Sequence, residues 1–376
     1  MVSSSIATDP GSSTSCPGDR PARLNFEEAI SLFRSAPLHE LGKRASEVRQ
    51  RLVPGEVVTY LIDRNINYTN VCNSDCSFCG FYRPSPDHPE SYVLSREEIG
   101  KKIEEALELG ATRILFQGGH HDGLDFRFYV DIVRWMSESY PIEVNAFSPS
   151  EIFQMQKVSG LSLEEILVEL RDAGLKGLPG GGAEILDDEV RKRVSPKKIR
   201  SDEWIEVMAI AHSIGLTTTA TMVIGLGETI EQRINHLERL RKLQDQSRSL
   251  GYEGFNAFIS WPLQHNENTS LGRSRHRGRY GADGIEYLRN VALARIYLDN
   301  IAHHAASWPT LGTEIGKLAL HFGCDDFGST MMEENVVSKA GALTTSKWSM
   351  SPEELQHVIR QAGFVPIQRT TSYAFV

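Results

Sequence analysis

The sequence has no excess of basic residues. Lysine and arginine together number 40 and aspartate and glutamate 49, so the formal net charge is −9. General binding to nucleic acid or to an anionic membrane depends on a surplus of Lys and Arg, so this balance argues against both classes of partner. An anionic small molecule would therefore need a local basic pocket.

Long apolar runs are also missing. No run approaches the about 20 residues of a membrane-spanning helix, so we expect no association with a membrane. The N-terminal stretch has no basic region followed by an apolar one, which argues against a secretory signal. Because residues 1–23 are rich in Ser, Pro and Gly, we expect them to be a disordered leader on a cytoplasmic protein.

Cysteines are few, and their spacing is uneven. The five are Cys16, Cys72, Cys76, Cys79 and Cys324. An odd, sparse set in a large cytosolic chain is a poor framework for disulfides. We expect Cys324 to be a small buried apolar residue and assign no role to Cys16. The other three lie within positions 72–79, and this clustering is the most informative feature of the sequence.

β-Branched runs alternate with helical patterns along most of the chain. The run 112–116 is typical of a buried strand, and residues 25–50 are expected to form a helix. Three Ser-x-x-Glu sequences, at Ser95, Ser162 and Ser351, are typical of helix starts. About seven or eight strand–helix units favour an α/β fold, a full or partial (βα) barrel of the TIM type, over a doubly wound sheet.

The expected organisation has four parts. They are a leader (1–23), an N-terminal helical segment (24–54), a barrel core (55–300) and a C-terminal extension that completes or caps the barrel (301–376). The active site of such a barrel lies at the C-terminal ends of its strands, in the βα loops. Each chemically suggestive segment follows an expected strand, so we expect one shared site: NVCNSDC, QGGHH, PGGGAE, GLGE and SWPLQ.

Three cysteines in one loop can bind a single metal centre. Cys72, Cys76 and Cys79 directly follow an expected strand. A structural zinc site normally takes a fourth Cys or His and a paired CxxC arrangement, which the neighbouring sequence lacks. Three thiolates instead suit a [4Fe–4S] cluster in which one iron has no protein ligand and is open to a substrate or cofactor.

The segment CNSDCSFC (72–79) resembles the CxxxCxφC motif of the radical S-adenosylmethionine (radical SAM) superfamily, with Phe78 at the aromatic position. This resemblance implies a [4Fe–4S] cluster whose open iron chelates S-adenosyl-L-methionine. It also implies reductive cleavage to a 5′-deoxyadenosyl radical, which abstracts hydrogen from an unactivated C–H bond. A flavodoxin- or ferredoxin-type protein is the implied electron donor.

Other loops resemble further elements of the same superfamily. Residues 117–119 look like the glycine pair that lets the backbone approach the methionyl group, although a tight turn with positive φ would explain these glycines equally well. The loop 180–184 places a carboxylate where it could accept hydrogen bonds from ribose hydroxyls, and 225–228 resembles the GxxE element beside adenine. The expected cofactor-binding residues are Phe78, Gln117, Gly118, Gly119, Glu184, Gly225 and Glu228.

Within the superfamily, the sequence resembles the branch that contains the menaquinone-pathway and deazaflavin-pathway enzymes. DRNINYTNVC (63–72), PGGGAEIL (179–186) and FNAFISW (255–261) carry this resemblance, and Gly80 stands where that branch is expected to have alanine. The resemblance implies dehypoxanthine futalosine as a small-molecule substrate. It implies hydrogen abstraction at C4′ of the ribose, followed by addition of the carbon radical to the benzoate ring.

That reaction needs a group that binds the benzoate carboxylate and a group that accepts a proton. Arginine binds carboxylates through two parallel hydrogen bonds, but a surface or structural ion pair remains open for each candidate. Tyr82 follows the cysteine motif and could relay an electron or proton, with packing as the alternative. The expected catalytic residues are Tyr82, Arg64 and Arg295. Other candidates near the substrate are Arg83, His120, His121, Asn65, Asn67, Asn70, Trp261 and Trp308.

Three alternatives stay open from the sequence. The first is a sister radical enzyme, an aminofutalosine synthase or a deazaflavin-precursor synthase. The second is a zinc-stabilised binding module without catalysis, and the third is a plain (βα) hydrolase with incidental cysteines. Iron analysis, together with substrate assays, would separate them.

Overall fold

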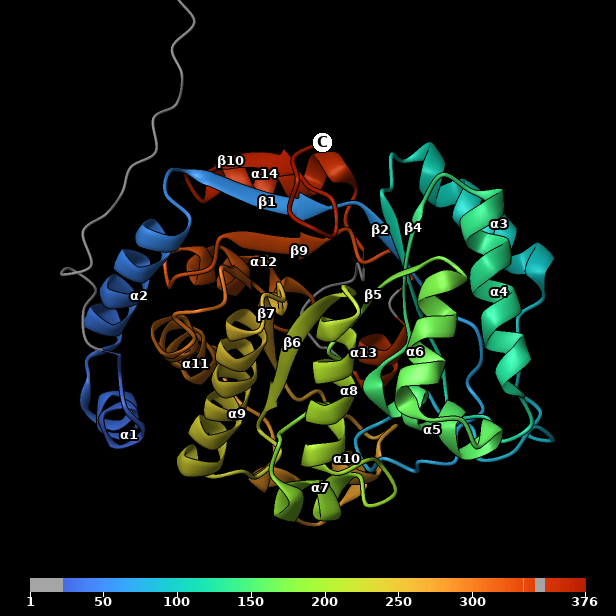
Figure 1. The fold of residues 1–376 in the computed structure, drawn as a ribbon. Helices are drawn as coiled ribbons and strands as arrows, with labels where there is room; N and C mark the ends of the chain where they lie inside the picture. The colour runs from blue at the N-terminus through green and yellow to red at the C-terminus, as the bar shows by residue number, and fades with distance from the viewer. Residues whose placement is uncertain (1–22, 334, 342–348) are drawn as a thin grey trace, which may run out of the picture.

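Ten parallel strands form one sheet at the centre of the computed structural model (Figure 1), which describes residues 23–333, 335–341 and 349–376. The expected disordered leader lies outside the described residues except for Arg23. Along the sheet the strand order is β10-β1-β9-β8-β7-β6-β5-β4-β3-β2. The strands are β1 (Val57–Leu61), β2 (Asp63–Asn67), β3 (Arg113–Gln117), β4 (Glu143–Ala146), β5 (Leu175–Leu178), β6 (Thr217–Ile224), β7 (Phe255–Pro262), β8 (His303–Ala305), β9 (Asp326–Ser329) and β10 (Val365–Gln368).

The sheet curls into a barrel. Strand β1 pairs with β9 and β10, whereas β2 pairs with β3 at the other end of the order. Only Ile62 separates β1 from β2, so consecutive residues belong to opposite ends of the sheet. The backbone N–H of Asn65 also donates to the carbonyl of Met332, just past β9, over 2.9 Å. Because the order from β2 to β9 never reverses, the doubly wound alternative is wrong and the TIM-like barrel is confirmed.

Helices surround the sheet (Figure 1). All three predicted Ser-x-x-Glu starts form capping boxes, which open α3, α6 and α14. The helices are α1 (Phe26–Ser35), α2 (Leu38–Leu52), α3 (Arg96–Glu108), α4 (Phe126–Ser139), α5 (Pro149–Ser159), α6 (Leu163–Asp172), α7 (Asp188–Val194), α8 (Ser201–Ser213), α9 (Ile230–Ser249), α10 (Ser270–Arg273), α11 (Gly284–Tyr297), α12 (Trp308–Leu320), α13 (Asn335–Ala340) and α14 (Pro352–Gln361). Among the described residues, no helix is both long and apolar enough to cross a membrane.

The single helix predicted over 25–50 is two helices, α1 and α2. Ala36 has an extended backbone (φ −69°, ψ 135°) and precedes Pro37. A proline ring disfavours helical geometry in the residue before it, so the chain turns here. The break lets α1 pack on α9 while α2 packs on α11.

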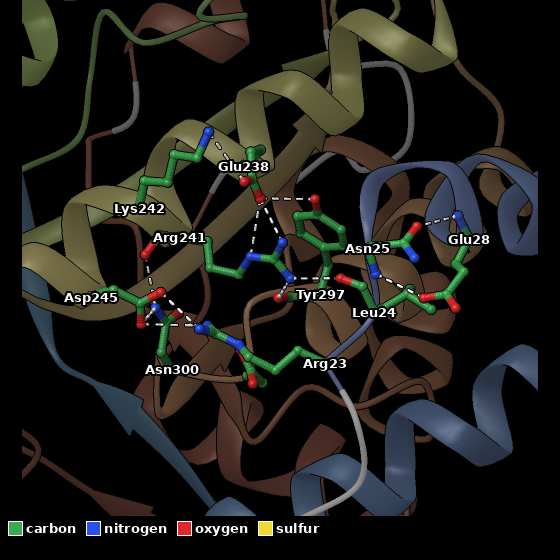
Figure 2. A network of polar contacts seen from close by, with 11 residues as sticks. Arg23, Leu24, Asn25, Glu28, Glu238, Arg241, Lys242, Asp245, Tyr297 and Asn300 are labelled. Atoms are coloured by element: carbon green, nitrogen blue, oxygen red, sulfur yellow. Dashed lines mark hydrogen bonds and ion pairs between the residues drawn. The ribbon is translucent and has the colours of Figure 1, made fainter.

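Polar contacts fasten the start of the described chain to the barrel's outer helices (Figure 2). The Arg23 guanidinium donates to Asp245 at 2.8 Å and to Asp299 at 2.6 Å. Arg241 donates to the Leu24 carbonyl at 2.8 Å and lies over the ring of Tyr297, 3.8 Å from its centroid. Arg23 and its partners are roughly half exposed, so these ion pairs orient the segment more than they stabilise it.

The C-terminal part of the chain belongs to the barrel. Residues 301–376 supply β8, β9 and β10, and β10 pairs with β1 from the start of the sheet. Cys324 lies just before β9 and is buried, at 1% exposure, as expected.

Candidate active site

One cavity of about 450 Å³ lies inside the barrel and opens among the loops that follow the strands. Residues from the loop after β2, the end of β3, the loop after β5 and the end of β7 line it together. Four of the five segments singled out in the sequence therefore meet around one space. The fifth, 225–228, does not line it.

The three clustered cysteines all line this cavity. Cys76 is buried, and Cys72 and Cys79 are partly exposed. Hydrogen bonds from the Cys72 amide to the Arg83 carbonyl and from the Ser77 amide to the Val194 carbonyl, both 2.9 Å, hold their loop. Burial raises the pKa of the Cys76 thiol to about 12, and the nearby charge of Lys198 opposes this shift.

The cysteines are not arranged around a single ion. Among the residues that the structure describes, no group of three His, Cys, Asp or Glu side chains could hold one metal ion. In a cubic iron–sulfur cluster each thiolate binds a different iron, so the sulfur atoms need not converge on one point.

Gly118 and Gly119 press against the segment that leads into the cysteines. A Cβ on Gly118 would lie 2.6 Å from the Tyr68 ring, and one on Gly119 would lie 2.1 Å from the Val71 carbonyl oxygen. Neither glycine has a positive φ, so the tight-turn explanation is wrong. Close packing of β3 on the cysteine segment requires glycine here. Gln117 and both glycines line the cavity, as the expected cofactor role requires.

A fully buried carboxylate supports this glycine pair. Glu151, at the start of α5, accepts hydrogen bonds from Tyr68 Oη and the Gly118 amide, both at 2.9 Å. Its second oxygen accepts from the amide of Ser148 at 2.7 Å. Glu151 was not predicted from the sequence, although Ser148-x-x-Glu151 is the same capping-box pattern that predicts three other helix starts.

Glu184 lines the cavity and belongs to a buried charge cluster. Lys198 Nζ lies 2.7 Å from Glu184 Oε1, and Arg191 lies 3.7 Å from Oε2. Lys198 also lies over the ring of Phe78, 5.7 Å from its centroid, and the charges of Glu184 and Cys76 raise its pKa despite burial. Lys198, which links the expected ribose-binding carboxylate to the cysteine loop, was also not predicted from the sequence.

Gly225 and Glu228 lie off the cavity wall. Glu228 accepts hydrogen bonds from the amides of Gly225 and Leu226 at 2.9 and 2.7 Å, and it pairs with Arg233 at 2.6 Å. Its side chain is fully buried. These contacts assign Glu228 to holding the turn after β6, and they do not support direct contact of its carboxylate with a nucleotide in the cavity.

The arginines expected to bind the substrate carboxylate do not line the cavity. Arg64 Nη1 pairs with Glu105 at 2.5 Å and its Nη2 with Glu333 at 2.8 Å. Arg295 is fully buried and donates to the Ala302 carbonyl at 2.7 Å. Neither lines the cavity. Both side chains occupy structural contacts away from the cavity. Arg83 likewise pairs with Glu90 and does not line the cavity.

Tyr82 lies on the cavity wall and is already hydrogen-bonded. Its hydroxyl donates to Asp75 at 2.6 Å, and this bond raises the pKa of Tyr82 to about 12. His120 Nδ1 lies 2.7 Å from Ser74 Oγ, and burial lowers its pKa to about 3, so it is neutral. The remaining candidates that line the cavity are Asn65, Asn67, Asn70, Trp261 and Trp308. His121 does not line it.

Two further arginines, Arg113 and Arg369, line the cavity and were not predicted from the sequence. Arg113, the first residue of β3, donates to Asp63 at 2.7 and 3.0 Å. Arg369, after β10, pairs with Asp326 and lies over the ring of Tyr373. Each guanidinium has one Nη without a hydrogen-bond partner among the described residues. Strand alternation with Leu115 and Gln117 could have placed Arg113 inside, but nothing local marks Arg369.

Comparisons with known proteins agree with this site. The family model described as the radical SAM superfamily matches residues 66–240, and the model described as the CofH/MqnC C-terminal region matches 252–376. The cyclic dehypoxanthine futalosine synthase of Halalkalibacterium halodurans is 45% identical over 94% of this chain and 92% of its own. The cyclic dehypoxanthine futalosine synthase of Streptomyces coelicolor is 42% identical over 93% of this chain and 85% of its own.

Sister enzymes and solved structures match as well. A 5-amino-6-(D-ribitylamino)uracil–L-tyrosine 4-hydroxyphenyl transferase from Archaeoglobus fulgidus is 41% identical over 89% of this chain and 93% of its own. The aminodeoxyfutalosine synthase of Thermus thermophilus is 34% identical over 93% and 92%. The hydrogenase maturase HydG of Carboxydothermus hydrogenoformans shares the fold alone, with a TM-score of 0.71 at 18% identity over 93% of this chain and 77% of its own.

One barrel cavity is thus lined by the three cysteines, the glycine pair and the Glu184 carboxylate. The two family models match consecutive segments of the same chain. Members of this superfamily use a [4Fe–4S] cluster and S-adenosylmethionine. The chain belongs to the radical SAM superfamily, in the enzyme family that includes the cyclic dehypoxanthine futalosine synthases of the menaquinone pathway.

Proposed function

We propose that the chain converts dehypoxanthine futalosine to cyclic dehypoxanthine futalosine. The observation that carries this proposal is the order of similarity among its relatives. Identity is 45% and 42% to the two cyclic dehypoxanthine futalosine synthases and falls to 41% for the hydroxyphenyl transferase and 34% for the aminodeoxyfutalosine synthase.

The residues around the cavity fit the two cofactors. Three thiols on one loop face the same space, and the described part of the cavity wall holds no fourth cysteine. Cys72, Cys76 and Cys79 would hold the cluster. Gln117, Gly118, Gly119 and Glu184 would hold the sulfonium nucleotide. When bound, these groups supply a 5′-deoxyadenosyl radical that abstracts hydrogen from C4′ of the substrate's ribose.

The chain's own residues bind and enclose the substrate. Arg113 and Arg369 are the arginines on the cavity wall, and each has one N–H-bearing nitrogen left to donate to the benzoate carboxylate. Trp261 and Trp308 face the same space and can stack on the benzoate ring. Enclosure within the barrel excludes water, which protects a radical from side reactions.

The hydroxyphenyl transferase reaction is the second candidate, because that relative's identity is only a few percentage points lower. Anaerobically reconstituted, reduced protein should be incubated in parallel with dehypoxanthine futalosine and with L-tyrosine plus 5-amino-6-(D-ribitylamino)uracil. We expect the cyclic product from the first mixture only. Product from the second mixture, or 5′-deoxyadenosine without a cyclic product in the first, would refute the proposal. The Cys324→Ala variant, altered at a cysteine away from the cavity, should behave like the unchanged chain.

A further inference from the structure

Residues 273–279 form a strongly basic loop on an otherwise acidic chain. Their sequence is Arg-Ser-Arg-His-Arg-Gly-Arg, whereas the chain as a whole has a net charge of −9. The four arginines and the histidine are all exposed. Because like charges repel, such a cluster is unfavourable unless an anionic partner covers it.

This loop adjoins the loop that carries the cysteines. The Leu271 amide donates to the Ser77 carbonyl over 2.9 Å, and Ser77 lies between Cys76 and Cys79. The Ser77 amide in turn donates to the Val194 carbonyl, also over 2.9 Å, at the end of α7. Helices α7 and α10 accordingly lie together at the lower edge of the molecule in Figure 1.

The end of α7 and the residues after it add further exposed cations on the other side of Ser77. Together the two segments form a surface that we call the basic rim. Its members are Lys192, Arg193, Lys197, Arg273, Arg275, His276, Arg277 and Arg279.

The charges of the basic rim are largely uncompensated. Within the described ranges, Lys192, Arg193 and the four arginines of 273–279 form no ion pair. The pair between Lys197 and Asp75 is long, at 3.6 Å, and both side chains are more than half exposed. Arg193 instead donates to the Gly227 carbonyl at 3.0 Å, and Arg273 to the Glu267 carbonyl at 2.8 Å. These backbone bonds hold the side chains in place and leave their charge for a partner.

We propose that the basic rim docks an acidic protein that carries single electrons, and thereby brings its redox group beside the cysteine loop. This inference rests on the proposed function, since only a redox centre held by the three cysteines gives such a partner a purpose. The carrier would lose one electron and the cluster would gain it, with no atom or proton transferred. The negative charge of the remaining surface would repel the carrier elsewhere, which orients the encounter.

The test compares two triple charge reversals of equal net change. R275E/R277E/R279E alters the basic rim, and K43E/R44E/R51E alters exposed residues of α2 that form no ion pair with any residue the structure describes. The affinity of each reconstituted protein for an oxidised bacterial flavodoxin would be measured by calorimetry at low and high salt. The rate at which reduced flavodoxin reduces the iron–sulfur absorbance would be measured by stopped flow, with photoreduced deazariboflavin as an uncharged comparison reductant.

We expect the rim variant to lose about tenfold or more in flavodoxin affinity and reduction rate at low salt, with the difference shrinking at high salt. Reduction by deazariboflavin should not change, and the α2 variant should match the parent chain. Equal losses of flavodoxin affinity in both variants, or no loss in the rim variant, would overturn the docking proposal. Neither result would affect the proposed cyclisation, which is tested by a separate assay. Rim-dependent retention on DNA or on phosphatidylserine vesicles with unchanged flavodoxin affinity would also overturn it. Failure of the function itself would instead show as no cyclic product with the uncharged reductant.

Discussion

Replacing Lys198 by methionine tests the buried charge cluster that ties Glu184 to the cysteine loop. The Lys198 side chain is 15% exposed and that of Glu184 7%, and their charged atoms are 2.7 Å apart. Removing one partner of a buried ion pair typically costs ~3–5 kcal/mol, because the other charge is left uncompensated. Arg191 stays 3.7 Å from Glu184 and offsets part of this loss, so we expect ~2–3 kcal/mol for K198M.

The same reasoning makes the double variant informative. E184Q leaves Lys198 buried without its partner and should cost about as much as K198M. In E184Q/K198M only Arg191 lacks a carboxylate partner, and its guanidinium keeps its hydrogen bonds to three backbone carbonyls. For 376 residues the unfolding entropy is about 0.8 kcal/mol/K, so each single variant should lower Tm by about 3–4 °C. The double variant should lose about as much as one single variant. K197M, at an exposed neighbour, serves as the control and should change Tm little. Additive losses in the double variant would refute a coupled pair.

Three further outcomes follow from the structure. Cys76→Ala should lose bound iron and the visible absorbance of the reconstituted protein, yet it should still unfold cooperatively. Cys324→Ala should keep its iron. Iron retained by the Cys76→Ala variant would contradict the proposed cluster site. Gly119→Ala should lower both Tm and iron content because its Cβ would meet the Val71 carbonyl at 2.1 Å, while Gly278→Ala, with open space around it, should change neither. Burial lowers the pKa of His236 from 6.5 to about 3, so its contribution to stability is complete above pH 6.5 and is lost as the pH falls, by roughly 1.4 kcal/mol per pH unit. His236→Asn keeps an acceptor for the Leu186 amide. Between pH 6 and 4, the free energy of unfolding measured in urea should therefore fall less steeply with decreasing pH in this variant, by that same amount per pH unit. An unchanged slope would contradict a neutral buried histidine.

The barrel could be predicted from the sequence because its signals are local. Strand and helix patterns alternate at regular intervals, and three helix starts formed the capping boxes that their Ser and Glu residues specify. Helix α5 was missed although it begins with the same pattern. Closure of the barrel, by contrast, depends on β1 and β2 being neighbours in sequence at opposite ends of the sheet, and no local pattern reports that.

The residues of the site also fall into two groups, those that local motifs predict and those that only the whole fold places. The cysteine loop and the glycine pair are contiguous motifs, and each follows an expected strand. The sequence was therefore enough to predict that both line one cavity. Which arginines reach the cavity could not be predicted, because the inward direction of a side chain depends on the pleat and on contacts distant in sequence. Arg64 points away to Glu105, whereas Arg113 reaches the cavity from the neighbouring strand. Arg369 enters from a segment about 250 residues away from β3 in sequence, a proximity set by the whole fold.

We propose that this cavity directs a radical to the C4′ ribose carbon of dehypoxanthine futalosine. Incubation with substrate deuterated at C4′, followed by mass spectrometry of the nucleoside product, measures this step directly. We expect one deuterium in 5′-deoxyadenosine, formed in step with the cyclic product. Unlabelled 5′-deoxyadenosine accompanied by the cyclic product would contradict it.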